Sequence, residues 1–403
     1  MKYAIVLCDG MADTPSDILG GKTPMELAKK PVMDWLAANG KVGMVQTIPE
    51  GMTPGSDVAN LAVMGYDPKI YYTGRSPFEA ANIGIELDHD DLAFRCNLVT
   101  LSKDIKYSDK TMVDYCAGDI HTKQADEIIR DIQLAFGGGD FDFYTGTAYR
   151  HCMVWHGGKS IQEAMTPPHD ITGRIIGSHL PLAPEAAPLL DMMKRSTDIL
   201  KNHPVNVERE KAGLNAANAI WLWGQGKKPS LEPYKELFAV DGAVISAVDL
   251  IKGIGLIAGM KVCEVEGATG YIDTNFQGKV SAAVSELQSG RDFVYIHLEA
   301  PDECGHRGEA ENKVRSIEDI DNRILKPLLN ELKKMGEFRL MVLPDHPTPL
   351  STRTHSSSPV PFLIYSSNNI TSSGVSKFTE ETASKTGVHV EDGHNLIRKL
   401  FNK

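Results

Sequence analysis

Carboxylate and imidazole side chains gather just after several short apolar runs of this 403-residue sequence, at points where strands should end. They are Asp9 after Tyr3–Cys8, Asp302 and His306 after Phe293–Leu298, Asp345 and His346 after Arg339–Leu343, and His355 in the next loop. In an open parallel sheet, the loops at the carboxyl ends of the strands form the ligand crevice. We therefore expect these side chains to face one cleft.

A set of carboxylates and imidazoles without cysteine suits Mn²⁺, Zn²⁺ and similar ions. Three aspartates and three histidines are enough for two ions, with coordination positions left for a substrate or a nucleophile. Each residue alone has an ordinary explanation, because an aspartate after a strand often caps a turn or helix and a lone histidine is more often structural. Their common place at one predicted sheet edge favours a two-metal centre.

Ser56 is the candidate nucleophile. It follows Pro54-Gly55 and begins a predicted helix, whose dipole and free N–H groups favour a nearby anion. A serine hydroxyl is a weak nucleophile at neutral pH, and coordination to a metal activates it. The same position also suits a helix N-cap, which is the commoner use of serine. Position alone leaves both roles open.

Two glycine-rich segments resemble nucleotide-binding motifs without matching them. Gly20–Thr23 looks like the end of a P-loop, but Ser16 stands where that motif needs glycine and no strand leads directly into it. We expect a turn that opens a helix there. Gly253–Gly259 misses the dinucleotide fingerprint by one residue of spacing, which indicates close helix packing instead.

Alternating strands and helices are expected to position the candidate site. Besides the three runs named above, strands are predicted over Val42–Ile48 and Pro361–Tyr365, and a helix over Lys22–Asn39. Such alternation is typical of parallel sheets that are covered on both faces. The fold class is therefore α/β, with a mostly parallel sheet and helices on both of its faces.

The middle of the chain has a different pattern. Strands are predicted at Ala93–Leu101 and Met153–Trp155, and the proline-rich stretch from Pro167 to Pro188 indicates a loop and a domain boundary. The length of the chain favours two domains, and both ends of the chain supply the same kind of strand. We therefore predict a smaller α/β domain, residues 76–219, inserted into a core formed by residues 1–75 and 220–403.

The charge and cysteine content narrow the classes of partner. The formal net charge is −11, and a field of that sign repels nucleic acid and anionic lipid. Six cysteines without CxxC spacing indicate reduced thiols. The first apolar run is interrupted too early for a signal peptide, and no apolar stretch reaches the length of a membrane span. We expect a cytoplasmic protein with a small-molecule substrate, no nucleic-acid or membrane partner, and an oligomeric state that these features do not define.

Eight segments together resemble the cofactor-independent phosphoglycerate mutases of the archaeal-type branch, in the alkaline phosphatase superfamily. The segments are Asp9-Gly10, Pro54–Leu61, Tyr72–Pro77, Val248–Gly255, Gly267–Asn275, Glu299–His306, Pro344–Pro349 and Arg353–His355. The likeness runs over nearly the whole chain. It implies an alkaline-phosphatase-like core, an inserted substrate-binding domain, and the glycolytic interconversion of 3-phosphoglycerate and 2-phosphoglycerate.

The resemblance also implies roles for single residues. One metal would be held by Asp302, His306 and His355, and the other by Asp9, Asp345, His346 and the Ser56 oxygen. Ser56 would become a phosphoserine, and the two divalent ions would be Mn²⁺, with Zn²⁺, Co²⁺ or Mg²⁺ as alternatives. Substrate contacts are implied for Arg75, His121, Arg150, His151 and Lys279.

Other functions share this site chemistry. Members of the branch have been suggested to be homoserine kinases, and a plain phosphomonoesterase needs the same serine and metals. The sequence contains no P-loop or protein-kinase motif for ATP, which disfavours the kinase. A sulfatase is disfavoured because the Ser56 segment lacks a Cys-x-Pro-x-Arg pattern. A catalytically inactive binding protein is disfavoured because every ligand position is filled.

Overall fold

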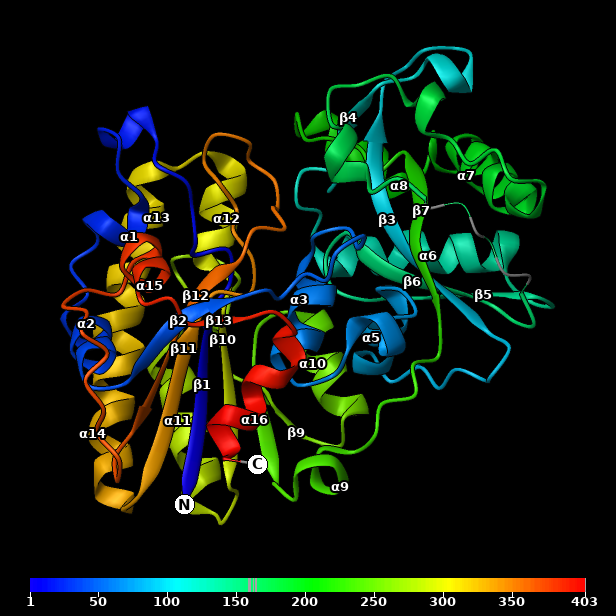
Figure 1. Ribbon diagram of the computed structural model, residues 1–403. Coiled ribbons are helices and arrows are strands. Elements are labelled where there is room, and N and C mark those ends of the chain that lie inside the picture. Colours follow the sequence, from blue (N-terminus) through cyan, green and yellow to red (C-terminus); the bar gives the residue numbers. More distant parts are fainter. Residues whose placement is uncertain (159–160, 162, 164, 403) are drawn as a thin grey trace. The chain divides into compact units, whose positions relative to one another are not determined.

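The computed structural model describes residues 1–158, 161, 163 and 165–402, and the chain forms two compact units (Figure 1). The core unit comprises Met1–Tyr72 and Ser230–Lys403, and the inserted unit comprises Thr73–Pro229. The boundary predicted after residue 219 falls at the start of strand β7 (Ala219–Lys227), which pairs with β3 (Leu92–Leu101) inside the inserted unit. Because β7 pairs with β3, the inserted unit continues to Pro229, beyond the predicted boundary.

The proline-rich stretch is not a boundary, contrary to the sequence-based expectation. It forms the short 3₁₀ segments η3 (Pro168–Ile171), η4 (Ile176–His179) and η5 (Pro184–Ala186). Ile171 and Ile176 are buried in the hydrophobic core of the inserted unit. Proline interrupts helices and strands, but these short turns still bury their apolar side chains.

The core unit is built on a sheet of mixed but mostly parallel strands. β12 is antiparallel to both of its neighbours, β11 and β2, whereas the other described pairings are parallel. β1 lies between β10 and β11, so Tyr3 pairs with Phe293 on one side and Arg339 on the other. In sheet order the strands are β13 (His389–Val390), β2 (Lys41–Val45), β12 (Val360–Ser366), β11 (Phe338–Leu343), β1 (Lys2–Cys8), β10 (Phe293–Leu298), β8 (Gly242–Ile245) and β9 (Lys261–Cys263).

Helices cover both faces of this sheet, as predicted for the fold class (Figure 1). On one face, Val6 of β1 packs into a core with Ile317 of α13 and Leu328 of α14. On the other face, Tyr3 and Phe293 contact the ring of Phe401 in α16. Successive strand residues point to opposite faces of a sheet. Because β1 is apolar from Tyr3 to Cys8, helices must cover both of its faces.

The long helix predicted over Lys22–Asn39 is in fact two helices. α1 (Pro24–Leu27) begins with a capping box between Thr23 and Glu26, and α2 (Pro31–Ala38) begins at Pro31. A proline lacks the N–H group that a continuous helix needs and pushes the preceding residue out of the helical region. The segment Gly20–Thr23, which resembles the end of a P-loop, therefore precedes a helix that is capped by Thr23, as predicted.

The remaining helical segments of the core unit connect and flank the strands. They are η1 (Asp17–Leu19), α3 (Ser56–Val63), α4 (Pro68–Tyr71), α9 (Tyr234–Phe238), α10 (Asp249–Ile257), α11 (Phe276–Gln288), α12 (Ala300–Arg307), α13 (Ala310–Asp319), the π-helical segment η6 (Ile320–Leu325), α14 (Lys326–Met335), α15 (Glu380–Lys385), η7 (Gly393–Asn395) and α16 (Leu396–Phe401). In α10, a Cβ added at Gly255 would lie 2.6 Å from Cγ2 of Val244. This close helix–strand contact confirms the packing role predicted for the glycine-rich segment.

The inserted unit has its own antiparallel sheet and core. β3 pairs with β7 on one side and with β6 on the other. Ile128 of α6 and Leu189 of α7 pack in one core cluster with β3, and Ala80 of α5 packs in a second cluster with Ala93. Besides β3, β7, η3, η4 and η5, its elements are α5 (Ser76–Asn82), η2 (Tyr107–Asp109), β4 (Met112–Asp114), α6 (Thr122–Phe136), β5 (Phe141–Tyr144), β6 (Arg150–Trp155), α7 (Ala187–Leu200) and α8 (Pro204–Lys211).

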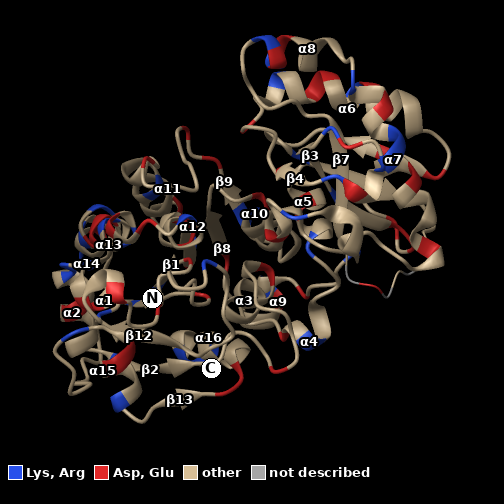
Figure 2. Ribbon diagram, turned by 90° about the horizontal axis from the view of Figure 1, so that it is seen from above, with Lys and Arg blue, Asp and Glu red and all other residues tan. Residues whose placement is uncertain are grey.

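Acidic and basic residues are interspersed on the helices of each unit (Figure 2). Several form ion pairs one helical turn apart, such as Arg195 with Asp191 at 3.1 Å. Exposed pairs of this kind contribute roughly 0.3–0.5 kcal/mol each to the free energy of unfolding, so they add little to the stability of the fold. All six cysteines are free, as expected for reduced thiols, and all six are buried. Among the described helices, none is long and apolar enough to cross a membrane.

His156 in the inserted unit is held between two carboxylates. Its Nδ1 lies 3.1 Å from Asp91 and its Nε2 lies 3.0 Å from Asp142. The hydrogen bond to Asp142 and the proximity of Asp91 raise the pKa of His156, although partial burial opposes the shift. Stability from a raised histidine pKa is fully present below the unfolded-state value and is lost as pH rises through the folded-state value. We expect His156→Gln to lower the free energy of unfolding more at about pH 5.5 than at about pH 8.5 in urea titrations.

The matched control is His89→Gln, because the His89 side chain is 97% exposed. This change should alter the free energy of unfolding by less than about 0.5 kcal/mol at either pH. An equal loss of stability for His156→Gln at both pH values would contradict the charged clamp.

Candidate active site

The first part of the site is the turn that follows β1. The N–H of Asp9 donates to the carbonyl of Leu298 at 2.9 Å, which extends the pairing of β1 with β10 by one residue. Gly10 has φ +61°, and a Cβ there would lie 2.6 Å from Cα of Asp302. Only glycine accepts both the left-handed backbone and this close approach. Gly10 therefore brings the Asp9 turn against the segment that carries Asp302.

The second part is α12, which places Asp302 and His306 on one helical face. Residues four apart on a helix are neighbours, and Nε2 of His306 lies 3.2 Å from Oδ2 of Asp302. Nδ1 of His306 lies 2.9 Å from the carbonyl oxygen of Arg353. A carbonyl only accepts, so Nδ1 carries the proton. The Nε2 of His306 then faces Asp302 and the Nε2 of His355, which is 2.9 Å away.

The third part is the loop after β11, which carries Asp345 and His346. Oδ1 of Asp345 accepts from the N–H groups of Gly10 at 3.1 Å and His346 at 2.8 Å. Oδ2 accepts from Nδ2 of Asn60 at 2.9 Å. Nε2 of His346 lies 3.4 Å from Oδ2 of Asp345 and 3.5 Å from Oδ1 of Asp9.

These contacts form two groups that could hold metal ions. In each group, the ligand atoms all lie within 4.8 Å of one another. One group is Asp302, His346 and His355, and the other is Asp9, Asp345 and His346. His346 belongs to both, and His306 adjoins the first through Asp302 and His355. The six aspartates and histidines singled out in the sequence therefore lie together at one edge of the core sheet.

The charges of the cluster fit a cation. Burial, followed by the nearby charges of Asp345 and Asp302, raises the pKa of Asp9 well above its usual range. Oδ1 of Asp9 is buried and accepts no hydrogen bond from any described residue. Burial opposes the ionisation of Asp302, but His306 and His355 hold its pKa well below the usual range. Asp302 in turn raises the pKa of His306 to about 9, against the effect of burial. A bound divalent ion would supply the positive charge that these closely spaced carboxylates need.

Ser56 is the first residue of α3, and Gly55 is the N-cap. Its hydroxyl forms no capping bond within the described chain, so the helix-cap role left open by the sequence is wrong. Instead, Oγ of Ser56 lies 3.1 Å from Nε2 of His346, the residue common to both candidate metal groups. The hydroxyl is thus directed at the cluster from the positive end of a helix.

Four of the five predicted substrate residues lie in the inserted unit. Arg75 donates from Nε to Glu79 at 2.9 Å, and the exposed His121 caps α6 through its side chain. The guanidinium of Arg150 lies 5.0 Å from the ring centre of Tyr149. His151 is buried, which lowers its pKa to about 3, and its Nε2 has no hydrogen-bond partner among the described residues. Their role in binding substrate stays a prediction.

The fifth, Lys279, lies in α11 of the core unit. Its Nζ is buried and donates to the carbonyl of His297 at 3.0 Å. Burial lowers the pKa of Lys279 to about 8, although Glu299 opposes the shift. A buried ammonium group of this kind is usually fixed by partners that the fold supplies.

Two polar residues near the cluster escaped the sequence-based prediction. Asn60 donates to Asp345, and its Oδ1 accepts from the hydroxyl of Tyr295 at 2.6 Å. Thr348 donates from its hydroxyl to Oδ1 of Asp302. Asn60 lies one helical turn after the candidate nucleophile, and that spacing was an available signal. Thr348 lies in the segment Pro344–Pro349 that carries the family resemblance, but its spacing did not distinguish it from a loop threonine.

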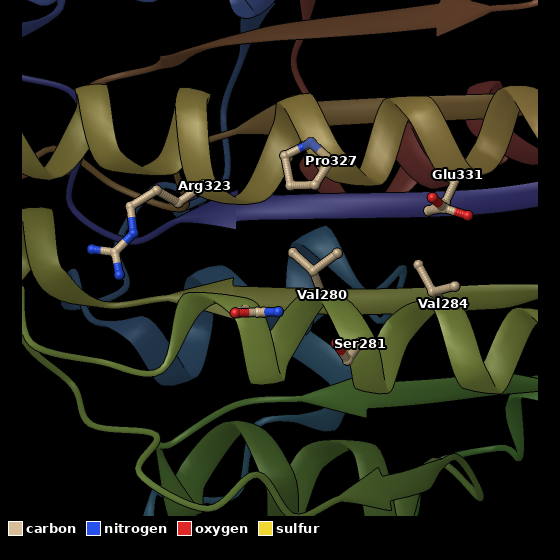
Figure 3. Close-up of a pocket in the computed structure, with 7 residues that line it drawn as sticks. Val280, Ser281, Val284, Arg323, Pro327 and Glu331 are labelled. Atoms are coloured by element: carbon tan, nitrogen blue, oxygen red, sulfur yellow. The ribbon is translucent and has the colours of Figure 1, made fainter.

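The core unit also has a groove of about 530 Å³ between α11 and α14 (Figure 3). Its lining residues are Gln277, Val280, Ser281, Val284, Arg323, Pro327 and Glu331. These described residues include no histidine, cysteine or aspartate, so the groove offers neither a metal ligand set nor a strong nucleophile. Both candidate metal groups of the described residues lie instead beside Ser56.

The fold and the site define an α/β protein with a serine beside two carboxylate–imidazole groups suited to metal ions. A model of the 2,3-bisphosphoglycerate-independent phosphoglycerate mutases matches residues 37–206. A probable enzyme of this name from Geobacter sulfurreducens is 48% identical over 403 residues, and one from Methanothrix thermoacetophila is 49% identical, with all of both chains covered in each case. The chain belongs to the 2,3-bisphosphoglycerate-independent phosphoglycerate mutase family, which confirms the family predicted from the sequence.

Two solved structures match the chain over its whole length. A protein from Pyrococcus horikoshii matches with a TM-score of 0.79 and 30% identity, covering 100% of this chain and 97% of the other. The cofactor-independent phosphoglycerate mutase from Thermoplasma acidophilum matches with a TM-score of 0.62 and 26% identity, covering 100% and 99%. The match extends through both units of the chain.

Proposed function

We propose that the protein interconverts 3-phosphoglycerate and 2-phosphoglycerate, with Ser56 carrying the phosphoryl group between the two hydroxyls. The observation that supports this most directly is the 3.1 Å contact between Oγ of Ser56 and Nε2 of His346. It joins the candidate nucleophile to both candidate metal groups. The substrates are proposed from the names of the relatives, since the site chemistry alone suits any phosphate monoester.

We assign two divalent ions to the site, with Mn²⁺ proposed. Asp302, His306 and His355 would hold one, and Asp9, Asp345, His346 and the Ser56 oxygen the other. Bound there, the ions would lower the pKa of the serine and neutralise charge on the phosphoryl oxygens. The free Oδ1 of Asp9 supports this assignment, because a buried carboxylate oxygen without a donor requires a cation or a proton.

The protein's own groups then have defined parts. Oγ of Ser56 gives up its proton and attacks phosphorus, the bond from phosphorus to the glycerate oxygen breaks, and that oxygen takes up a proton. The other glycerate hydroxyl then gives up its proton and attacks the phosphoserine, the bond from phosphorus to Oγ breaks, and Oγ regains a proton. The N-terminus of α3 favours the anionic phosphoryl group throughout. We assign the retention of glycerate to Lys279 and to the four residues of the inserted unit, Arg75, His121, Arg150 and His151.

An enolase-coupled assay tests the proposed function. We expect the purified protein to consume 3-phosphoglycerate in the presence of a divalent metal and without added 2,3-bisphosphoglycerate. Phosphate release from p-nitrophenyl phosphate without coupled turnover would replace the mutase by a phosphatase. ATP consumption that depends on homoserine, again without coupled turnover, would replace it by a kinase.

Metal binding should also stabilise the fold. A ligand that binds only the native state adds about 2.7 kcal/mol to the free energy of unfolding at 100 times its dissociation constant. We therefore expect metal-free protein to unfold at lower urea concentration than protein supplied with Mn²⁺. The double variant Asp302→Asn, Asp345→Asn is the control, because it removes one carboxylate from each group and should abolish the shift. An identical urea midpoint for the wild type with and without Mn²⁺ would contradict the metal assignment.

A further inference from the structure

A buried histidine that has no part in the proposed chemistry contacts the Asp9 carboxylate. His297 lies in β10 and its side chain is completely buried. Its Nε2 lies 2.8 Å from Oδ2 of Asp9, and its Nδ1 lies 3.2 Å from Oγ of Ser246, at the end of the neighbouring strand β8. Adjacent parallel strands thus build a chain of polar contacts from Ser246 through His297 to Asp9.

The hydrogen-bonding partners define where the protons lie in this chain. The N–H of Val248 donates to Oγ of Ser246 at 2.9 Å, so the serine's own proton is free to be donated onward. An imidazole that accepts at Nδ1 carries its proton on Nε2, and a carboxylate that binds a metal ion only accepts. Ser246 therefore donates to Nδ1, and Nε2–H donates to Oδ2 of Asp9.

The two oxygens of Asp9 consequently differ. Oδ2 is occupied by His297, whereas Oδ1 is buried and accepts no hydrogen bond from the described residues. Oδ1 is also the atom that lies 3.5 Å from Nε2 of His346. His297 thus holds Oδ2 in place, while Oδ1 faces the other residues of the candidate metal group.

We infer that His297, held in one tautomer by Ser246, is a positioning residue that orients Asp9 so that Oδ1 binds the ion of the Asp9–Asp345–His346 group. The inference rests on the proposed metal centre and adds the reason why Asp9 has a fixed orientation there. Hydrogen-bonding partners behind metal ligands fix ligand geometry, and their loss weakens metal affinity by about 10–100-fold. A histidine that merely filled space in the core would affect stability without favouring one of the two metal groups.

Direct Mn²⁺ titration, followed by electron paramagnetic resonance and calorimetry, tests the inference without an activity assay. The variants Asp345→Asn and His355→Ala identify which binding step belongs to which group. We expect His297→Leu to weaken the step that Asp345→Asn removes by about 10–100-fold. The other step should weaken by clearly less, because His297 contacts Asp9 alone and reaches the other group only through the shared His346.

Two further variants separate positioning from packing. The amide nitrogen of glutamine reaches about as far as Nε2 of histidine, so His297→Gln should keep the donor to Asp9 and retain most of the affinity. Ser246→Ala removes one hydroxyl and frees the tautomer, so it should weaken the same step by less than His297→Leu does. It also keeps the inference testable if His297→Leu does not fold. His156→Gln, in the inserted unit, should leave both steps unchanged.

Wild-type affinity in both His297→Leu and Ser246→Ala would overturn the inference, and so would equal weakening of both binding steps. Wild-type protein that binds two Mn²⁺ ions but does not turn over phosphoglycerate would refute the proposed function alone. The effect of His297 on the Asp9 group would still be measured in that case. Wild-type protein that binds no Mn²⁺ would overturn both.

Discussion

Replacing Ser56 with alanine is expected to lower kcat for phosphoglycerate interconversion by about four orders of magnitude or more, because loss of a nucleophile removes the covalent route entirely. The helix should survive, since Gly55 is the N-cap and the Ser56 hydroxyl contacts His346 instead of the helix end. The enolase-coupled assay measures the loss. Mass spectrometry of quenched wild-type reactions should show one phosphoryl group on the peptide that contains Ser56.

Ser281→Ala is the matched control, because Ser281 lies on α11 in the groove of Figure 3 and takes no part in the Ser56 cluster. It should leave kcat unchanged. Mn²⁺ binding should persist in Ser56→Ala, since the proposed carboxylate and imidazole ligands all remain. Full activity in Ser56→Ala would show that the nucleophile assignment is wrong, and a phosphorylated residue elsewhere would identify its replacement.

Lys313→Met is expected to lower the free energy of unfolding by about 3–5 kcal/mol, because it leaves a buried charge without its partner. Nζ of Lys313 lies 2.8 Å from Oδ2 of Asp13, and both side chains are fully buried. The same ammonium group donates to the carbonyl of Thr348 at 2.7 Å, in the loop that carries Asp345. Methionine keeps most of the volume, so the loss reports charge more than packing. Urea unfolding of metal-free protein measures it.

A second substitution separates the charge from the rest of the contact. Asp13→Asn in the Lys313→Met background removes the stranded carboxylate, and it should recover part of the lost stability. Lys334→Met is the surface control, because that lysine side chain is 70% exposed and pairs with Glu331 across one helical turn. It should cost less than about 0.5 kcal/mol. A similar cost at Lys313 and Lys334 would contradict the buried ion pair.

The strands that carry the site could be predicted because their mostly apolar sequences match the buried positions that they occupy. Every residue of the run Phe293–Leu298 except His297 is apolar, and β10 has these same bounds. All of these residues are buried, because both faces of the strand are covered. Asp9 and Asp345 could be placed together because parallel neighbours end at one edge of a sheet. The helix predicted over Lys22–Asn39 was wrong at Pro31, where the hydrophobic period continues but the backbone cannot.

The supporting contacts could not be predicted for a different reason. Asp13 and Lys313, Thr348 and Asp302, and His297 and Ser246 are polar pairs whose partners are far apart in the chain. No local period or spacing links such residues, and their proximity follows only from the strand order. Sequence patterns therefore favour the candidate ligands, whereas the groups that orient those ligands require the fold.

The place of β1 between β10 and β11 also has a consequence for synthesis. The first strand of the core pairs with residues near positions 293 and 339, so it has no neighbour until most of the chain has left the ribosome. The inserted unit, by contrast, draws all of its strands from one continuous segment, Thr73–Pro229. Domains generally fold as units, earlier segments first, and pairings between distant residues are slow to form. The insertion can thus complete its own sheet during translation, while β1 is among the last strands to be enclosed.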